Sequence, residues 1–229
     1  MALADASELR GTFGIPADKI QIHMAGGVPT DGHMPGDTED DVKAVEAMAE
    51  TISRKDVVIV LTASGTTPFA LAIAQAAKAK GAIIIGIANN PDTPLLELAD
   101  EPIYIATPPE VIAGSTRLGA GTAQKATLNL MSTLMGVELG HVYQGEMVNV
   151  VADNAKLVQR AVGMVSRIAC VSDDAARTAI TQTKGLVKPA ILVASGVTSE
   201  KAMILLEANK GHLGPCLLSL KANQTNLSN

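Results

Sequence analysis

Short apolar segments alternate with helix-like segments in the first half of the chain. Four segments are aliphatic and rich in β-branched residues, namely residues 20–24, 57–61, 82–87 and 103–106. The second and third are continuous apolar runs, which is typical of strands buried on both faces of a parallel sheet. This alternation predicts the α/β class, with a doubly wound, flavodoxin-like parallel sheet sandwiched by helices.

The helices between these strands have recognisable starts and ends. Residues 40–52 carry apolar side chains at helical spacing, and Thr38 with Asp41 forms a start that resembles a capping box. Residues 69–80 follow Pro68 and end at Gly81, the expected placement of proline and glycine around a helix. Two helices are therefore expected to pack on the sheet.

The second half of the chain has a helical pattern. We expect long helices over residues 124–139 and 148–169, and shorter ones over 173–180, 190–194 and 199–208. Residues 190–194 would also suit a strand by propensity, but their neighbours are helical and no partner strand is apparent. The tail from Lys221 is polar and is expected to fray.

Composition narrows the possible functions. The 229 residues have a net charge of −5, with 47% hydrophobic and only 2% aromatic residues. A nucleic-acid platform needs aromatic faces and a basic groove, and neither is present. No apolar run approaches the roughly 18 residues of a membrane helix, and residues 1–10 lack a signal-peptide pattern. We therefore expect a cytoplasmic protein with no nucleic-acid or membrane partner.

The first candidate site follows a predicted buried strand. Ser64, Gly65, Thr66 and Thr67 join the strand at 57–61 to the start of the next helix. Ligands of open parallel sheets bind beyond the carboxyl ends of the strands, and a helix N-terminus attracts anions. Spacing alone gives phosphate binding and an ordinary helix cap about equal weight, because both use the same residue types.

A second candidate precedes the long helix predicted at 124–139. Ser115, Thr116 and Arg117 lie there, with Lys125 shortly after. The alternative interpretation is a flexible loop, in which Glu110 pairs with Arg117 or Lys125 for ~0–1 kcal/mol at the surface. The spacing does not match a P-loop.

The third candidate is the acidic run at residues 37–41, which includes Glu39. A carboxylate there could act as a general base. Acidic residues are also common in a first helical turn, where the helix dipole stabilises them by ~0.3–1 kcal/mol each. The residues alone favour this structural role for Glu39.

Other catalytic chemistry has little support in the sequence. Ser64 is not in a Gly-x-Ser-x-Gly elbow, and Cys170 lies on an apolar helical face. The histidines are scattered without metal-ligand spacing, at His23, His33, His141 and His212. The sequence therefore predicts neither a serine hydrolase nor a metal site.

A long stretch of the sequence is more specific than these general features. Residues 109–118, continuing through 121–125 and 128–129, closely resemble a signature of the N-acetylmuramic acid 6-phosphate etherase family. This family is related to the glucokinase regulatory protein and has the sugar-isomerase (SIS) fold. Supporting matches lie at residues 12–16, 25–27, 39–41, 63–65, 67–68 and 90–92. The resemblance extends over nearly the whole chain.

The resemblance implies a lyase of cell-wall recycling and amino sugar metabolism that uses no metal or organic cofactor. Such enzymes convert N-acetylmuramate 6-phosphate to N-acetylglucosamine 6-phosphate and D-lactate, by elimination across C2–C3 followed by hydration. By motif match, Glu39 takes the position of the base, and Glu8 that of the acid that protonates the leaving lactate oxygen. Two carboxyl groups in different protonation states suit this chemistry.

The resemblance also implies which residues hold the substrate and how the chain assembles. The substrate-binding positions are Ser64, Gly65, Thr66, Thr67, Ser115, Thr116 and Arg117. The partner is a small phosphosugar, and we expect a homodimer because SIS proteins usually pair. The alternative function is a non-catalytic phosphosugar-binding or regulatory SIS protein. A phosphosugar isomerase would share the sheet but would not need the signature at 114–125.

We expect an SIS domain over residues 1–169, a small helical subdomain over 170–214 and a tail over 215–229. The family's first strand and its Gly/Ser/Thr-rich loop align upstream of Met1. In the family's sheet that strand lies between those matched by residues 20–24 and 57–61, so the SIS domain is expected to lack both the strand and the loop. Thr66 and Gly119 stand where the family has arginine and lysine, which reduces positive charge near the anion site.

Overall fold

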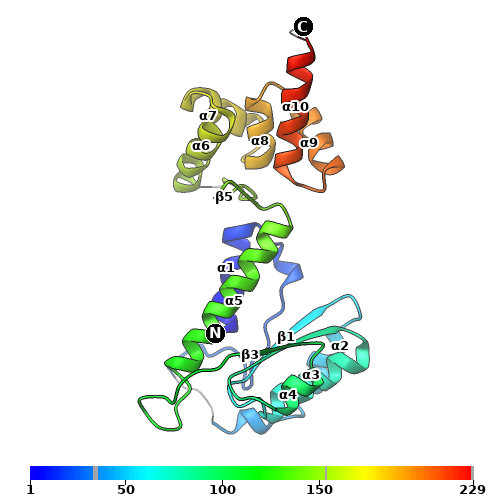
Figure 1. Cartoon of the computed structure of the whole chain (residues 1–229), viewed down its shortest axis with the longest axis vertical. Helices are drawn as coiled ribbons and strands as arrows, with labels where there is room; N and C mark the ends of the chain where they lie inside the picture. The colour runs from blue at the N-terminus through cyan, green and yellow to red at the C-terminus, as the bar shows by residue number, and fades with distance from the viewer. Residues whose placement is uncertain (33–35, 153, 228–229) are drawn as a thin grey trace. The chain divides into compact units, whose positions relative to one another are not determined.

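The computed structural model describes residues 1–32, 36–152 and 154–227, and side chains as far as residue 222. The chain divides into two compact units (Figure 1). The first unit comprises Met1–Asp5 and Gln21–Asn129, and the second comprises Ala6–Ile20 and Leu130–Asn229. The predicted boundaries at 169 and 214 stay predictions, and His33 lies outside the described residues.

A parallel sheet forms the centre of the first unit. Its described strands are β1 (Val57–Leu61), β2 (Ile83–Ala88) and β3 (Glu101–Tyr104), in the order β1-β2-β3. Both pairs are parallel, with Ile59 opposite Ile85 in the first pair. β1 and β2 are apolar and rich in β-branched residues, as the sequence predicts, whereas β3 lies at Glu101–Tyr104 rather than at the expected 103–106 and begins with a charged residue and a proline. The α/β class and the parallel sheet are therefore confirmed.

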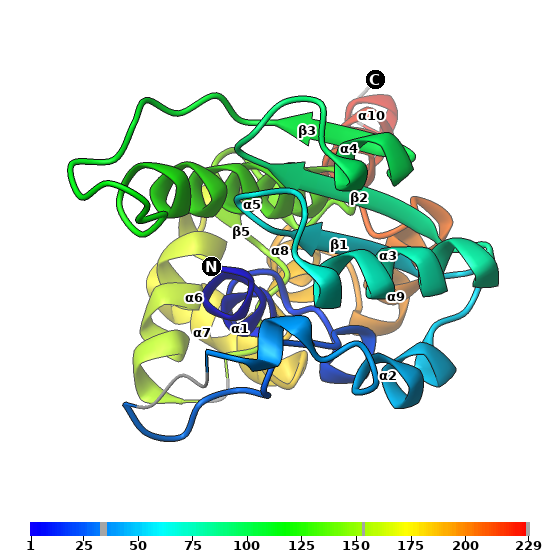
Figure 2. The same cartoon turned by 90° about the horizontal axis from the view of Figure 1, so that it is seen from below.

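Helices α3 (Pro68–Lys80) and α4 (Pro94–Leu98) pack on this sheet, and α2 (Val45–Thr51) packs on α3, as Figure 2 shows. Each of α3 and α4 begins with a proline, and α3 ends at Gly81 in the left-handed region, with φ of 74°. Small side chains let α3 approach the strands closely. Ala74, Ala77 and Ile84 are fully or almost fully buried in the core between them.

Two expectations for the first unit are wrong. Residues 20–24 form no strand, since a strand needs a ladder partner and none lies beside them among the described residues. The continuous helix expected over residues 40–52 is instead two separate pieces, the short η2 (Thr38–Asp40) and α2, which begins only at Val45. Hydrophobic periodicity did not show this break.

Two helices continue from one unit into the other. These are α1 (Ala2–Phe13) and α5 (Gly119–Glu138). Within the first unit, Asn129 of α5 donates to the buried Asp5 carboxylate of α1 at 2.5 Å. Within the second unit, Phe13 lies so close to Gly136 that a side chain there would meet its ring at 2.6 Å. The glycine thus permits the close packing of the two helices.

The second unit is largely helical. Its later helices are α6 (Ala155–Ala169), α7 (Asp173–Gln182), α8 (Val187–Ala194), α9 (Ser199–Ala208) and α10 (Leu213–Leu227). Asn154, Ser172 and Thr198 each accept a hydrogen bond from the first turn of the helix that follows. The tail predicted from Lys221 lies in the last part of α10.

The helix predicted from residue 148 starts later than expected. A hairpin of β4 (Val142–Tyr143) and β5 (Glu146–Met147) precedes this segment. Val151 then bridges to Leu186, and Ala152 donates to the Gly185 carbonyl at 2.9 Å. These backbone contacts hold Val151 and Ala152 outside the helix, and α6 begins at Ala155 after its N-cap Asn154.

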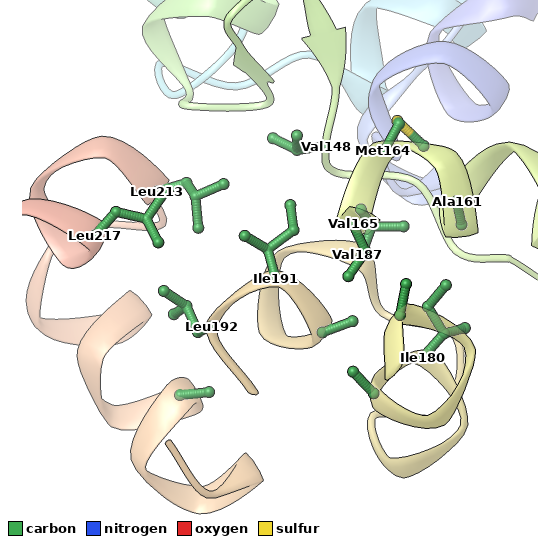
Figure 3. Close-up of a cluster of buried hydrophobic side chains, with 14 of the residues drawn as sticks. Val148, Ala161, Met164, Val165, Ile180, Val187, Ile191, Leu192, Leu213 and Leu217 are labelled. Atoms are coloured by element: carbon green, nitrogen blue, oxygen red, sulfur yellow. The ribbon is translucent and has the colours of Figure 1, made fainter. Parts of the chain in front are cut away.

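The core of the second unit lies among α6–α10. Figure 3 shows the side chains of Val165, Ile191, Leu192 and Leu213 converging there, and all four are almost completely buried. The choice of helix over strand for residues 190–194 is confirmed by α8. Among the described residues, no single helix combines the length and hydropathy that crossing a membrane requires. The bent pair α8–α9 meets both criteria only when taken together.

Candidate functional site

A cluster of hydroxyl groups lies at the carboxyl end of β1. Residues 62–67, which we call the anion loop, connect β1 to α3. The Thr62 and Thr67 hydroxyl oxygens are 2.7 Å apart, and that of Ser64 lies 3.2 Å from that of Thr62. The Thr66 hydroxyl donates to the Ser64 oxygen at 3.1 Å. The four hydroxyl side chains thus share one network.

Thr67 occupies the N-cap position of α3 but does not cap the helix. Its hydroxyl bonds within the anion loop instead, and Pro68 at the first helical position has no N–H. Among the described residues, the backbone N–H groups of Gly65, Phe69 and Ala70 have no backbone acceptor. These amides lie at the positive end of a thirteen-residue helix without a side-chain cap, an arrangement that can accommodate an anion.

Gly65 is needed for the shape of this loop. Its φ of +73° lies in the left-handed region, and an added Cβ would come within 2.2 Å of the Thr93 Oγ1. The Gly65 carbonyl accepts a hydrogen bond from Leu95 N–H at 3.2 Å. The anion loop is therefore packed tightly against the start of α4.

Asn89 connects the loops at the carboxyl edge of the sheet. Its backbone N–H donates to Ala63 at 3.0 Å, and its side-chain amide donates to Ile105 at 3.1 Å. Its Oδ1 accepts from the buried Gln124 of α5 at 2.9 Å. The beginning of α5 is thereby fixed at the edge that carries the anion loop.

The segment with Ser115, Thr116 and Arg117 leads into α5. Arg117 N–H donates to Ser115 Oγ at 3.3 Å, and the Thr116 carbonyl accepts from Gly121 at 2.9 Å. The Thr116 and Arg117 side chains are exposed. These residues belong to the first unit, as the anion loop does.

Glu110 caps α5, so the pairing with Arg117 or Lys125 that the alternative interpretation offered is not made. Its Oε1 accepts from Gly119 N–H at 2.8 Å and from Ala120 N–H at 3.2 Å. The first amides of a helix need acceptors, and a carboxylate is favoured at the positive end of the helix. The carboxylate therefore bonds the backbone rather than either cation.

Glu39 lies on η2, which contacts α3 in the first unit. The capping expected of Thr38 and Asp41 together is made by Asp41, whose carboxylate accepts from Lys43 N–H at 3.0 Å and Ala44 N–H at 3.3 Å. The Glu39 side chain is exposed. Glu39 lies in the first turn of η2, as the structural interpretation expects, and its carboxylate faces solvent.

Glu8 lies on α1 in the second unit, and its side chain is exposed. The structure thus brings Ser64, Gly65, Thr66 and Thr67 together in one loop. It places Glu39 and residues 115–117 in the same unit as that loop and Glu8 in the other.

Three residues at this edge were not singled out from the sequence. They are Asn89 and Gln124, which bond each other, and Thr93, which packs on Gly65. The only signal for Thr93 is its place before Pro94, which is typical of a helix start. Asn89 directly follows a buried strand, as residues at this edge do.

The second unit holds a separate group of buried polar side chains. Lys188 is buried and donates to the Gly211 carbonyl at 2.8 Å, beside a cavity of about 230 Å³. Burial lowers the pKa of Lys188 to about 8, and burial also raises the pKa of Cys216. Among the described residues, no three His, Cys, Asp or Glu side chains form a group that could hold a metal ion.

The fold is an α/β domain whose anion loop lies at the carboxyl edge of a parallel sheet, where open sheets of this kind bind their ligands. The SIS domain family matches residues 32–134, which include β1–β3 and the anion loop.

Comparison with curated proteins identifies the family more narrowly. The chain is 41% identical to the N-acetylmuramic acid 6-phosphate etherase of Deinococcus radiodurans, over 93% of this chain and 70% of that protein. It is 37% identical to the etherase of Edwardsiella ictaluri, over 95% of this chain and 73% of that protein. It is 40% identical to N-acetylmuramic acid 6-phosphate etherase 2 of Bacillus licheniformis, over 93% of this chain and 72% of that protein. The chain belongs to the N-acetylmuramic acid 6-phosphate etherase family.

Proposed function

We propose that this protein is a lyase that cleaves the D-lactyl ether of N-acetylmuramate 6-phosphate. The observation that carries the proposal is the anion loop, whose hydroxyls and free amides at the α3 N-terminus suit a phosphate group. Membership of the etherase family supplies the substrate class. The products are N-acetylglucosamine 6-phosphate and D-lactate.

The proposed reaction has two stages. A base takes the C2 proton beside the open-chain sugar carbonyl, the C3–O bond breaks, and an acid protonates the departing lactate oxygen. Water then adds at C3 of the unsaturated sugar and a proton returns to C2, so the overall change is hydrolysis of the ether. Both stages need carboxyl groups held in opposite protonation states.

The roles of the two glutamates follow the family match, and those of the substrate-binding residues follow the match together with the geometry of the first unit. Glu39 is proposed as the base and Glu8 as the acid, which then activates water. The anion loop, through Ser64, Gly65, Thr66 and Thr67, is proposed to hold the phosphate. Ser115, Thr116 and Arg117 are proposed to contact the sugar or the phosphate. The bond from Gln124 to Asn89 supports this placement, because it fixes the start of α5 at the edge that carries the anion loop.

We also propose that the protein works in the cytoplasm, as a homodimer without nucleic-acid or membrane partners. In the second unit, α5 exposes Leu130, Leu134 and Val137 at helical spacing, with 60%, 57% and 49% of their surface accessible. An apolar stripe of this kind suits a helix–helix interface between two copies.

An isotope experiment tests the reaction type. With N-acetylmuramate 6-phosphate in H₂¹⁸O, elimination and hydration place ¹⁸O on C3 of the sugar product and none in the lactate hydroxyl. Unphosphorylated N-acetylmuramate should release no D-lactate. Label in the lactate hydroxyl would contradict the mechanism, and tight binding of the phosphosugar without lactate release would favour the regulatory alternative.

A further inference from the structure

Thr93 is a buried hydroxyl residue whose contacts do not fit an ordinary helix cap. It is the N-cap residue of α4, yet its side chain makes no capping hydrogen bond. It is only 5% exposed, and its Oγ1 has no hydrogen-bond partner among the described residues. Buried hydroxyls are almost always bonded, so this one needs an explanation.

The hydroxyl lies against the anion loop rather than against its own helix. The three atoms nearest to a Cβ placed on Gly65 are Oγ1, Cβ and Cγ2 of Thr93, at 2.2, 2.4 and 2.6 Å. The Leu95 N–H to Gly65 carbonyl bond, at 3.2 Å, ties the same two segments together. A shift of the Gly65 peptide would therefore change its contact with the Thr93 side chain.

We propose that Thr93 is a positioning residue for phosphate binding, whose hydroxyl gains a hydrogen bond within the anion loop when that loop holds a phosphate group. Because Oγ1 is out of reach of solvent, Thr93 acts through the loop and not by touching the ligand. A bond that is made only in the bound arrangement favours that arrangement by the full worth of the bond. The inference rests on the proposed phosphate site at residues 64–67.

Thr93→Val tests this directly, because it keeps the shape of the side chain and removes the hydroxyl. Without phosphate, the thermal midpoint of the variant should equal or exceed that of the unchanged protein, since an unpartnered buried group is removed. The affinity for inorganic phosphate, obtained from the rise in midpoint with phosphate concentration, should fall about three- to tenfold. Thr93→Ser should restore it to within about twofold.

Thr127→Val is the matched control on α5. The Thr127 hydroxyl donates to the Ala123 carbonyl at 2.9 Å, so its loss should lower the midpoint and leave phosphate affinity unchanged. Equal phosphate affinity in Thr93→Val and the unchanged protein would overturn the proposal. A lowered midpoint of Thr93→Val without phosphate, or no response of the unchanged protein to phosphate, would also overturn it.

The same variants separate this proposal from the proposed reaction. With N-acetylmuramate 6-phosphate, Thr93→Val should raise KM about three- to tenfold and leave kcat within about twofold. The phosphate is bound equally in the substrate complex and in the transition state, so weaker phosphate binding destabilises both by the same amount. If no lactate is released by any variant while the difference in phosphate affinity persists, the etherase proposal fails and the role of Thr93 stands.

Discussion

The shape of the anion loop depends on the absence of a Cβ at Gly65 and on the Thr67 hydroxyl. Gly65 combines a left-handed φ of +73° with contact to Thr93, so it meets two separate demands that no other residue type satisfies. The Thr67 hydroxyl bonds to Thr62 rather than capping α3, which leaves helix amides for a ligand. The loop is thus specified by hydroxyl contacts within it together with one contact to Thr93, a residue much further along the chain.

Gly65→Ala should separate the contact from the backbone strain. A Cβ at 2.2 Å from a buried side chain, added to an unfavourable φ, should lower the free energy of unfolding by about 3 kcal/mol and reduce phosphate affinity at least tenfold. Gly145→Ala is the control, because Gly145 has φ of +77° and nothing within 4 Å of the added Cβ. It should cost about 1 kcal/mol and leave phosphate affinity unchanged. Urea unfolding measures the free energy of unfolding, and titration measures the phosphate affinity. Equal effects of Gly65→Ala and Gly145→Ala would refute the proposed contact.

Lys188 should make stability depend on pH. Burial lowers its pKa from 10.5 to about 8, so between these values the unfolded chain binds more protons and stability should rise with pH. Lys188→Met removes the buried charge. Its gain in free energy of unfolding over the unchanged protein should be of order 3 kcal/mol near pH 7 and shrink toward pH 10.

Chemical denaturation at several pH values measures this difference. Cys216, whose pKa is raised, His141, whose pKa is lowered, and His212 also lie in this region, so the comparison uses the difference between the two proteins and not the absolute curve. A difference that stays constant from pH 7 to 10 would show that the Lys188 amine does not titrate in this range.

At the scale of elements, the beginning of α5 depends on one side chain from outside the helix. Glu110→Ala removes the acceptor for Gly119 and Ala120 and should cost about 1–2 kcal/mol in urea unfolding. Glu110→Gln keeps an oxygen acceptor and loses only the charge, so it should cost about 0.5 kcal/mol. If both variants cost the same, the carboxylate acts by its charge alone and not as a cap.

Elements set by local chemistry could be predicted, and those set by distant contacts could not. The helix at 69–80 carries its own start and stop in Pro68 and Gly81, and the structure confirms it. Residues 20–24 have strand composition but lack a ladder partner among the described residues. The start of the helix expected at 148 is moved by a backbone bond from Ala152 to Gly185, which periodicity cannot show.

The candidate site, like the secondary structure, could be predicted only where it is set by local sequence. A hydroxyl- and glycine-rich loop between a predicted buried strand and a helix pointed to Ser64–Thr67, although in the structure Val57 and Ile59 of that strand are exposed. Neither Thr93 nor the cap by Glu110 could be found in this way, since each depends on which loops meet at the sheet edge. The roles proposed for Glu8 and Glu39 came from family resemblance and stay predictions.

At the scale of the whole molecule, the exposed stripe on α5 predicts how copies associate. Leu134→Glu should convert the proposed dimer to monomer in sedimentation at micromolar concentration, because it puts a charge in an apolar interface. Leu218→Glu on α10 is the control, since Leu218 is 70% exposed and lies on another helix. The protein sedimenting as a monomer before any substitution would contradict the dimer.

The most direct test of the central claim is release of D-lactate from N-acetylmuramate 6-phosphate by the purified protein and by Glu39→Gln. Glutamine keeps the size of the side chain but cannot take a proton from C2. The proposed function predicts D-lactate release by the unchanged protein, and a loss of at least about a hundredfold in Glu39→Gln with phosphate affinity retained. Release at an equal rate by both proteins would contradict the role of Glu39, and no release by either would contradict the etherase activity itself.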